Sequence, residues 1–142
     1  MEKNTYEWKR EYELGIEDID FQHHFFFNLI LRLTAELTQS QEQVYQNALV
    51  DELIAYARFH FVSEENMMSR AGYPKLEEHK HLHHELLDQL STKSSLLSLT
   101  HSAKDSNGLL DFLMNWFFQH TTGEDKLFAQ YLGLGEPRHL SQ

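Results

Sequence analysis

The sequence predicts an all-α protein, an up-down-up-down antiparallel four-helix bundle with an N-terminal arm. Four segments carry apolar side chains at the three- and four-residue spacing of amphipathic helices, and short polar stretches separate them. The 142 residues include two prolines and six glycines, which favours long uninterrupted helices over a turn-rich sheet protein. Because short connections place successive helices antiparallel, an up-down bundle is the expected architecture.

Composition and charge limit the classes of function. Hydrophobic residues make up 41% of the chain, so we expect one globular domain spanning residues 1–142. A net charge of -10 argues against nucleic-acid and anionic-membrane partners, which favour basic surfaces. The absence of cysteine excludes disulfides, thiolate zinc sites and iron–sulfur clusters. Neither a secretory signal nor a membrane-spanning run is present, so a cytoplasmic location is expected.

The N-terminal part divides into an arm and a first helix. Residues 1 to about 17 are expected to form the arm, because their apolar side chains lack a clear helical period. This arm is predicted to pack across the mouth of the bundle. The first helix is predicted from Ile19 to Thr38, with Asp18 or Asp20 as its capping residue.

The two central helices are separated by a Gly-Tyr-Pro sequence. The second helix is predicted from about Gln43 to Arg70. It is expected to stop at Gly72 and Pro74, because glycine favours the position after a helix end and proline cannot continue the helix. The third helix is predicted from about Lys75 to Leu97.

The fourth helix follows a polar stretch at residues 100–106, which is expected to be a loop. Asn107 is the predicted capping residue of this helix. The bundle is therefore predicted to extend over about residues 18–132. Residues 133–142 are polar and contain glycine and proline, so they are expected to form a mobile tail or a linker.

Polar residues occupy the inward stripe of all four predicted helices. Two pairs, His60 with Glu64 and His79 with His83, are four residues apart and so share a helix face. A lone inward histidine is more often a hydrogen-bonded core residue, but a shared polar layer is costly unless its members satisfy each other or a metal. The residues concerned are His23, His60, Glu64, His79, His83 and His120. The remaining histidines are expected at the surface or beside these residues: His24, His81, His84, His101 and His139.

Several short motifs in order resemble a hemerythrin domain of the bacterial type. The resemblance covers about residues 8–132. Its motifs are Trp8, Ile19-Asp20-Phe21-Gln22-His23, Phe59-His60-Phe61 with Glu64-Glu65, Gly72-Tyr73-Pro74, His79 through His83, and Trp116 with His120 and Asp125. The resemblance implies a non-haem di-iron centre with an oxo or hydroxo bridge. It also implies that one iron is held by His79, His83 and His120, and the other by His23 and His60.

The resemblance further implies that Glu64 and Asp125 bridge the two irons. Asp125 follows His120 by five residues, which places it about 140° away on an ideal helix. Both can bind only if the helix ends, bends or bulges between them, and Gly123 is the residue expected to permit this.

The implied function is reversible binding of dioxygen at the one vacant position, on the iron of His23 and His60. Phe27 and Tyr56 are the predicted apolar wall of the oxygen pocket, with ordinary core packing as the alternative. The expected role is an oxygen carrier, or the oxygen- or redox-sensing input of a bacterial signalling protein with a C-terminal signalling domain such as a diguanylate cyclase. The domain itself is not expected to be an enzyme. A di-iron oxidase or nitric oxide reductase is the alternative, although the histidine-rich ligand set disfavours a ferritin-like oxidase.

Overall fold

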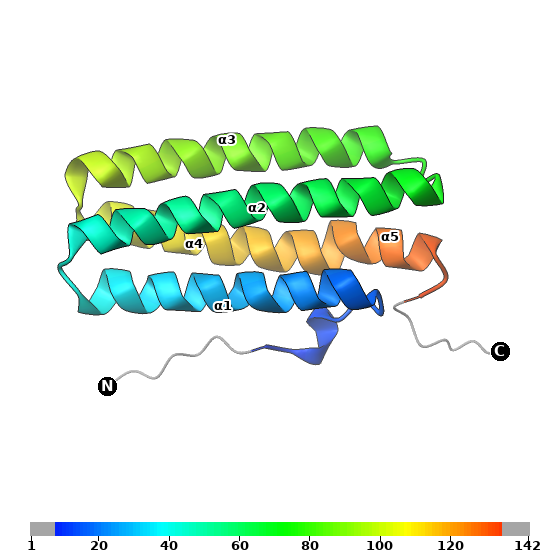
Figure 1. Cartoon of the computed structure of the whole chain (residues 1–142), viewed down its shortest axis with the longest axis horizontal. Helices are drawn as coiled ribbons and strands as arrows, with labels where there is room; N and C mark the ends of the chain where they lie inside the picture. Colours follow the sequence, from blue (N-terminus) through cyan, green and yellow to red (C-terminus); the bar gives the residue numbers. More distant parts are fainter. Residues whose placement is uncertain (1–7, 135–142) are drawn as a thin grey trace.

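A computed structural model describes residues 8–134, and every regular element in that range is helical (Figure 1). The all-α fold class predicted from the sequence is therefore confirmed. The tail at 135–142 and the first seven residues of the arm lie outside the described residues. The elements in chain order are η1 (Arg10–Tyr12), α1 (Glu17–Gln39), α2 (Gln43–Ala71), α3 (Leu76–Thr100), α4 (Ala103–Gln119), η2 (His120–Glu124) and α5 (Asp125–Tyr131).

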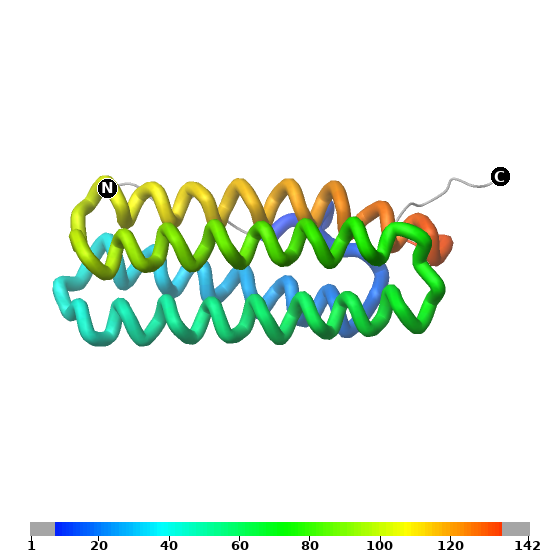
Figure 2. The backbone as a smooth tube through the Cα atoms, turned by 90° about the horizontal axis from the view of Figure 1, so that it is seen from above, coloured from blue at the N-terminus to red at the C-terminus, as the bar shows by residue number. Residues whose placement is uncertain are grey.

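Four long rods form the bundle, because η2 and α5 continue the line of α4 (Figure 1). Each rod packs against two others: α1 contacts α2 and α4, and α3 contacts α2 and α4. Seen from above, the α1–α2 pair lies beside the α3–α4 pair (Figure 2). Successive helices run in opposite directions, as the up-down-up-down prediction requires. No helix in the described range is both long and apolar enough to cross a membrane.

The arm lies along the start of α1 and is anchored by Asp20. The carboxylate of Asp20 accepts hydrogen bonds from the backbone N–H groups of Leu14 at 2.7 Å and Gly15 at 3.0 Å. Tyr12 and Leu14 are buried, so the described part of the arm packs against the bundle. The capping prediction was wrong: the N-cap of α1 is Ile16, which makes no side-chain capping bond, and Asp20 holds the arm instead.

The turn between α2 and α3 follows the Gly-Tyr-Pro prediction. Gly72 caps α2 in the left-handed conformation, with φ of 69°, and its N–H donates to the carbonyl of Ser69 at 3.1 Å. The N–H of Tyr73 donates to the carbonyl of Met68 at 3.0 Å, which completes the double hydrogen bond typical of a glycine-terminated helix.

Replacing Gly72 with alanine is expected to lower the free energy of unfolding by about 1 kcal/mol, because a Cβ atom is strained at positive φ. Gly108 provides the matched control. It lies within α4, and a Cβ placed there meets nothing within 4 Å, so Gly108→Ala is expected to stabilise by roughly 0.5–1 kcal/mol. Denaturant unfolding of both variants measures the two effects. A neutral Gly72→Ala would contradict this account of the turn.

The turn between α3 and α4 differs from the prediction. α3 continues to Thr100, and only His101 and Ser102 separate it from α4. Ser102, not Asn107, caps α4: its side chain accepts a hydrogen bond from the N–H of Asp105 at 3.1 Å. Both residue types are good caps, and Ser102 provides the cap because His101 adopts the left-handed conformation that ends α3, with φ of 50°.

The core consists of two apolar clusters with a polar layer between them. The larger cluster fills the bundle on one side of the layer and includes Phe26, Phe61 and Phe117. The smaller cluster closes the end of the bundle that faces the arm and α5, and includes Ile19 and Phe128. Along each helix, the polar residues predicted from the inward stripe lie between these two clusters. The layer is therefore shielded from water on both sides.

Candidate metal centre

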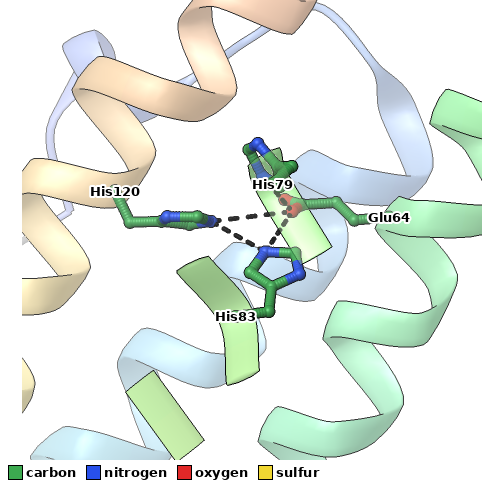
Figure 3. A group of neighbouring side chains, drawn as sticks. All are labelled: Glu64, His79, His83 and His120. Carbon is green, nitrogen blue, oxygen red and sulfur yellow. Dashed lines mark hydrogen bonds and ion pairs between the residues drawn. The ribbon is translucent and has the colours of Figure 1, made fainter. Parts of the chain in front are cut away.

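The structure brings all seven predicted site residues together in the polar layer. Each is no more than 4% exposed. Helices α1, α2 and α3 supply five of these residues, η2 supplies His120, and α5 begins with Asp125. Figure 3 shows Glu64, His79, His83 and His120 converging from three of the rods. The seven residues are His23, His60, Glu64, His79, His83, His120 and Asp125.

Three histidines gather around one oxygen of Glu64. Its Oε1 lies 3.3 Å from Nε2 of His79, 3.2 Å from Nε2 of His83 and 3.7 Å from Nε2 of His120. Asp125 Oδ1 lies 3.2 Å from Nε2 of both His79 and His120. The donor atoms of Glu64, His79, His83 and His120 are close enough to one another to surround one metal ion.

Two histidines gather around the other oxygen of Glu64. Its Oε2 lies 3.4 Å from Nε2 of His23 and 3.4 Å from Nε2 of His60. Asp125 Oδ2 lies 3.0 Å from Nε2 of His23. These four residues form a second group able to surround a metal ion, and Glu64 belongs to both groups.

Both carboxylates therefore divide their oxygens in the same way. Glu64 and Asp125 each direct one oxygen at the three-histidine group and the other at the two-histidine group. This is the arrangement that a carboxylate needs to bridge two metal ions. Imidazole and carboxylate donors suit non-haem iron, so the donor set fits a di-iron centre.

Asp125 reaches this layer because the last rod contains a π-helical turn. The N–H of Asp125 donates to the carbonyl of His120, five residues earlier, instead of the residue four positions earlier. This wider turn brings Asp125 Oδ1 within 3.2 Å of His120 Nε2, although an ideal α-helix would separate the two side chains by about 140°. The bulge expected between these residues is present, and single π turns of this kind occur frequently at functional sites.

Gly123 is not what permits the bulge. Its φ is not positive, and a Cβ added to it would meet nothing within 4 Å. The sequence-based assignment of this role to Gly123 is therefore corrected: nothing at this position requires glycine, and His120 and Glu124 at the two ends of the turn have ordinary helical backbone angles.

The variant Gly123→Ala is accordingly expected to fold normally and to bind the same amount of iron as the parent chain, because its Cβ has open space. Iron analysis of the purified variant and a thermal melt measure the two properties. Loss of iron would indicate that the π turn depends on glycine after all.

The electrostatics of the layer depend on its two buried carboxylates. Burial alone would lower the pKa of His23, His79 and His120. The adjacent carboxylates Asp125 and Glu64 outweigh this effect and raise the pKa values to about 9, 9 and 10 respectively. Burial lowers the pKa of His60. Burial raises the pKa of Glu64, but the surrounding histidines hold it well below its usual value. Cationic donors therefore already stabilise both carboxylates in the ionised form that a metal ion binds.

Hydrogen bonding among these residues is incomplete in a way that fits a metal ion. Within the described chain, seven buried side-chain atoms have no hydrogen-bond partner, and five of them belong to site residues: Nδ1 and Nε2 of His23, Oε2 of Glu64, Nδ1 of His120 and Oδ2 of Asp125. Three of these atoms face one another in the two-histidine group: Nε2 of His23 lies 3.4 Å from Oε2 of Glu64 and 3.0 Å from Oδ2 of Asp125, without the angles of a hydrogen bond. Buried polar atoms of this kind are costly unless another partner binds them.

Aromatic rings enclose the two-histidine group, but only one of the two predicted wall residues is among them. Tyr56 stacks parallel to His60, with ring centroids 6.5 Å apart. The ring centroid of Phe117 lies 5.9 Å from that of His23, and the centroid of Phe26 lies 6.2 Å from that of His60. The ring of Phe27 instead packs on the arm, 5.9 Å from Tyr12. The assignment of Phe27 and Tyr56 to an oxygen pocket remains a prediction.

Two further residues, which were not predicted from the sequence as site residues, form hydrogen bonds with site histidines. Each bonds to Nδ1, the outer ring nitrogen that faces away from Glu64. His60 Nδ1 lies 2.8 Å from Oε1 of Gln22, and His83 Nδ1 lies 2.7 Å from Oε2 of Glu65. The available signal was their position, because each is adjacent in sequence to a predicted ligand. Three of the histidines expected at the surface or beside the site are exposed: His24, His81 and His84. His139 lies outside the described residues.

Comparisons with known proteins agree with this site. The family model for the hemerythrin HHE cation binding domain matches residues 14–132. The chain is 32% identical to a bacteriohemerythrin of Clostridium acetobutylicum over 84% of this chain and 95% of that protein. It is 27% identical to a bacteriohemerythrin of Stenotrophomonas maltophilia over 95% and 84%, and 23% identical to myohemerythrin-1 of Phascolopsis gouldii over 84% and 88%. The chain therefore belongs to the hemerythrin family, and its cofactor is a non-haem di-iron centre.

Proposed function

We propose that this protein binds dioxygen reversibly at a di-iron centre, as an oxygen carrier or as the oxygen- or redox-sensing input of a signalling protein. His79, His83 and His120 hold one iron in this proposal, and His23 and His60 hold the other. Glu64 and Asp125 contact both groups and serve as the bridges. When the two irons are bound, they would supply reversible dioxygen binding at the iron with fewer protein ligands, which is the one held by His23 and His60.

The unequal histidine count carries the proposal. Glu64 belongs to both groups, and Asp125 directs Oδ1 at the three-histidine group and Oδ2 at the two-histidine group. With both carboxylates as bridges, the groups differ in having three or two imidazoles. An octahedral ion therefore retains one more open position in the two-histidine group. In that group Nε2 of His23, Oε2 of Glu64 and Oδ2 of Asp125 also lack hydrogen-bond partners within the described residues.

The surrounding side chains keep water from this open position. Phe26, Phe61 and Phe117 lie in the larger apolar cluster and are no more than 3% exposed. Phe61 contacts one histidine of each group: its ring centroid lies 5.8 Å from that of His60, and it stacks on His83 with the centroids 4.0 Å apart. A dry, apolar wall favours an uncharged diatomic gas over water and anions, and it slows loss of electrons from the site.

The proposal is tested by metal content and a visible spectrum. Iron analysis should give about two irons per chain, as the donor set requires. Anaerobic reduction followed by air should produce a visible charge-transfer band, which an argon purge removes and fresh air restores. Less than one iron per chain, or no band on exposure to air, would contradict the proposal.

The rate of irreversible oxidation separates the two roles. A carrier should complete many cycles of oxygenation and deoxygenation before the band is lost. Rapid oxidation without an oxygenated intermediate spectrum would instead support the redox-sensing role. Catalytic turnover of dioxygen or nitric oxide with a reductant would support the alternative, an oxidase or nitric oxide reductase, which no specific contact in this site favours.

A further inference from the structure

Two of the five site histidines have their outer nitrogen bound to another side chain, and the two partners differ in charge. His60 Nδ1 donates to the amide oxygen of Gln22 at 2.8 Å. His83 Nδ1 donates to the carboxylate of Glu65 at 2.7 Å. His60 belongs to the two-histidine group and His83 to the three-histidine group. A neutral acceptor therefore supports one group, and an anionic acceptor supports the other.

Gln22 is held in place at both ends of its side chain and at its backbone. Its Nε2 donates to the hydroxyl oxygen of Ser63 at 3.0 Å, while its Oε1 accepts from His60. Its backbone carbonyl accepts from the hydroxyl of Tyr56 at 2.9 Å. Gln22 lies in α1, whereas Ser63, Tyr56 and His60 all lie in α2. The residue thus connects the two helices directly beside a predicted ligand.

These contacts determine the proton position on His60. Nε2 of His60 points at Glu64 Oε2, and it must be unprotonated to bind a metal ion. The proton then sits on Nδ1, where the amide oxygen of Gln22 accepts it. Because Ser63 takes the N–H of the same amide, the amide does not need to rotate to make both bonds. The ring orientation and tautomer of His60 are both set by Gln22.

We propose that Gln22 is the positioning residue for the less-coordinated iron, and that its neutral amide makes His60 a weaker electron donor than His83, which Glu65 supports. This inference rests on the proposed function. An anionic acceptor increases the basicity of a metal-bound imidazole more than an amide does. The less-coordinated iron is therefore held by a weaker donor, which favours its reduced, dioxygen-binding state.

The first test is a metal titration of the metal-free protein with Co²⁺ alone, followed by its visible absorption. Gln22→Ala should weaken one of the two metal equivalents by about 10–100-fold and leave the other unchanged. Gln22→Glu should restore the affinity, because it again presents an acceptor to His60 and the Ser63 hydroxyl can donate to its second oxygen. Gln39→Ala, an exposed glutamine at the end of the same helix, should titrate like the parent chain.

A general disturbance of the fold at position 22 is not expected to explain a change in metal affinity. Every substitution at position 22 retains the backbone carbonyl that Tyr56 binds. An open pocket of about 350 Å³, lined in part by Gln22, lies on the outside, so a glutamate there remains partly hydrated. Equal weakening of both metal equivalents, or an unchanged titration, would overturn the positioning role. A parent chain that binds fewer than two Co²⁺ ions would instead contradict the proposed function.

The second test exchanges the two charges on the iron-loaded protein. Gln22→Glu should lower the midpoint potential of the iron pair, and Glu65→Gln should raise it, each measured by spectroelectrochemistry. The two substitutions nearly conserve shape, so a purely structural role predicts no opposite shifts. Shifts of the same sign, or no shift in either variant, would overturn the proposed difference in donor strength.

Discussion

Replacing Glu64 with alanine is expected to reduce bound iron from about two ions per chain to none. Glu64 is fully buried, and its two oxygens lie within 3.7 Å of Nε2 atoms from all five site histidines. Glu64 belongs to both metal-binding groups found in the described chain. Its removal takes one donor from each group and also leaves the cationic histidines with Asp125 as the only carboxylate of the layer.

The loss should also appear in stability. Removing one partner from a buried charged cluster costs about 3–5 kcal/mol, so the variant should melt well below the parent chain. Glu64→Gln keeps the volume but cannot present two anionic oxygens, so it separates loss of bridging from loss of packing if the alanine variant fails to fold.

The matched control for this prediction is Glu52→Ala. Glu52 lies on the same helix but is exposed, where it pairs with Arg32 at 3.6 Å. An exposed pair of this kind contributes about 0–1 kcal/mol, so this variant should retain both irons and nearly the full stability. Iron analysis and thermal melts of the three variants provide the measurements. A Glu64→Gln variant that still binds two irons would show that Glu64 does not bridge them.

The sequence predicted those parts of the fold that follow from local chemistry. Gly72 and Pro74 mark the end of α2 because a left-handed backbone and a missing N–H act at the residue itself. Helix ends governed by capping were predicted less well. Ser102 and Asn107 are both suitable caps, and the choice depends on where α3 ends, which the local pattern does not specify. Asp20 has a capping side chain but uses it to hold the arm.

The candidate site was accessible from the sequence because its spacing is mostly helical. His60 and Glu64, four residues apart, share a face in any α-helix. Asp125 was accessible only by resemblance, since the π turn that brings it inward changes the helical period within five residues. No simple pattern predicts such a turn, and Gly123 gave a misleading signal.

The aromatic side chains near His23 show a different limit of prediction from the sequence. Phe26 and Phe27 follow His23 by three and four residues, so both are neighbours of its helix face. Both are buried, but Phe26 packs towards His60 and Phe27 towards the arm. That choice depends on where the arm and the other helices lie. Tertiary packing of this kind is absent from the periodicity of a single helix.

Replacing His60 with alanine is expected to abolish the dioxygen-dependent band while one iron per chain remains. His60 is one of only two histidines in the less-coordinated group, and its Nε2 lies 3.4 Å from Glu64 Oε2. Without this imidazole the group retains one histidine and the two carboxylates, whereas His79, His83 and His120 still surround the other position. The effect should therefore be selective for one metal ion.

The control is His81→Ala, because the side chain of His81 is 75% exposed and forms an ion pair with Glu85 on the surface. This variant should retain two irons and the full band. Free imidazole added to His60→Ala should restore part of the second iron and of the band, because it replaces the missing donor in the space left by the ring. If His60→Ala instead keeps the reversible band at full intensity, dioxygen binds at the iron of the three-histidine group, and the assignment based on histidine count is wrong.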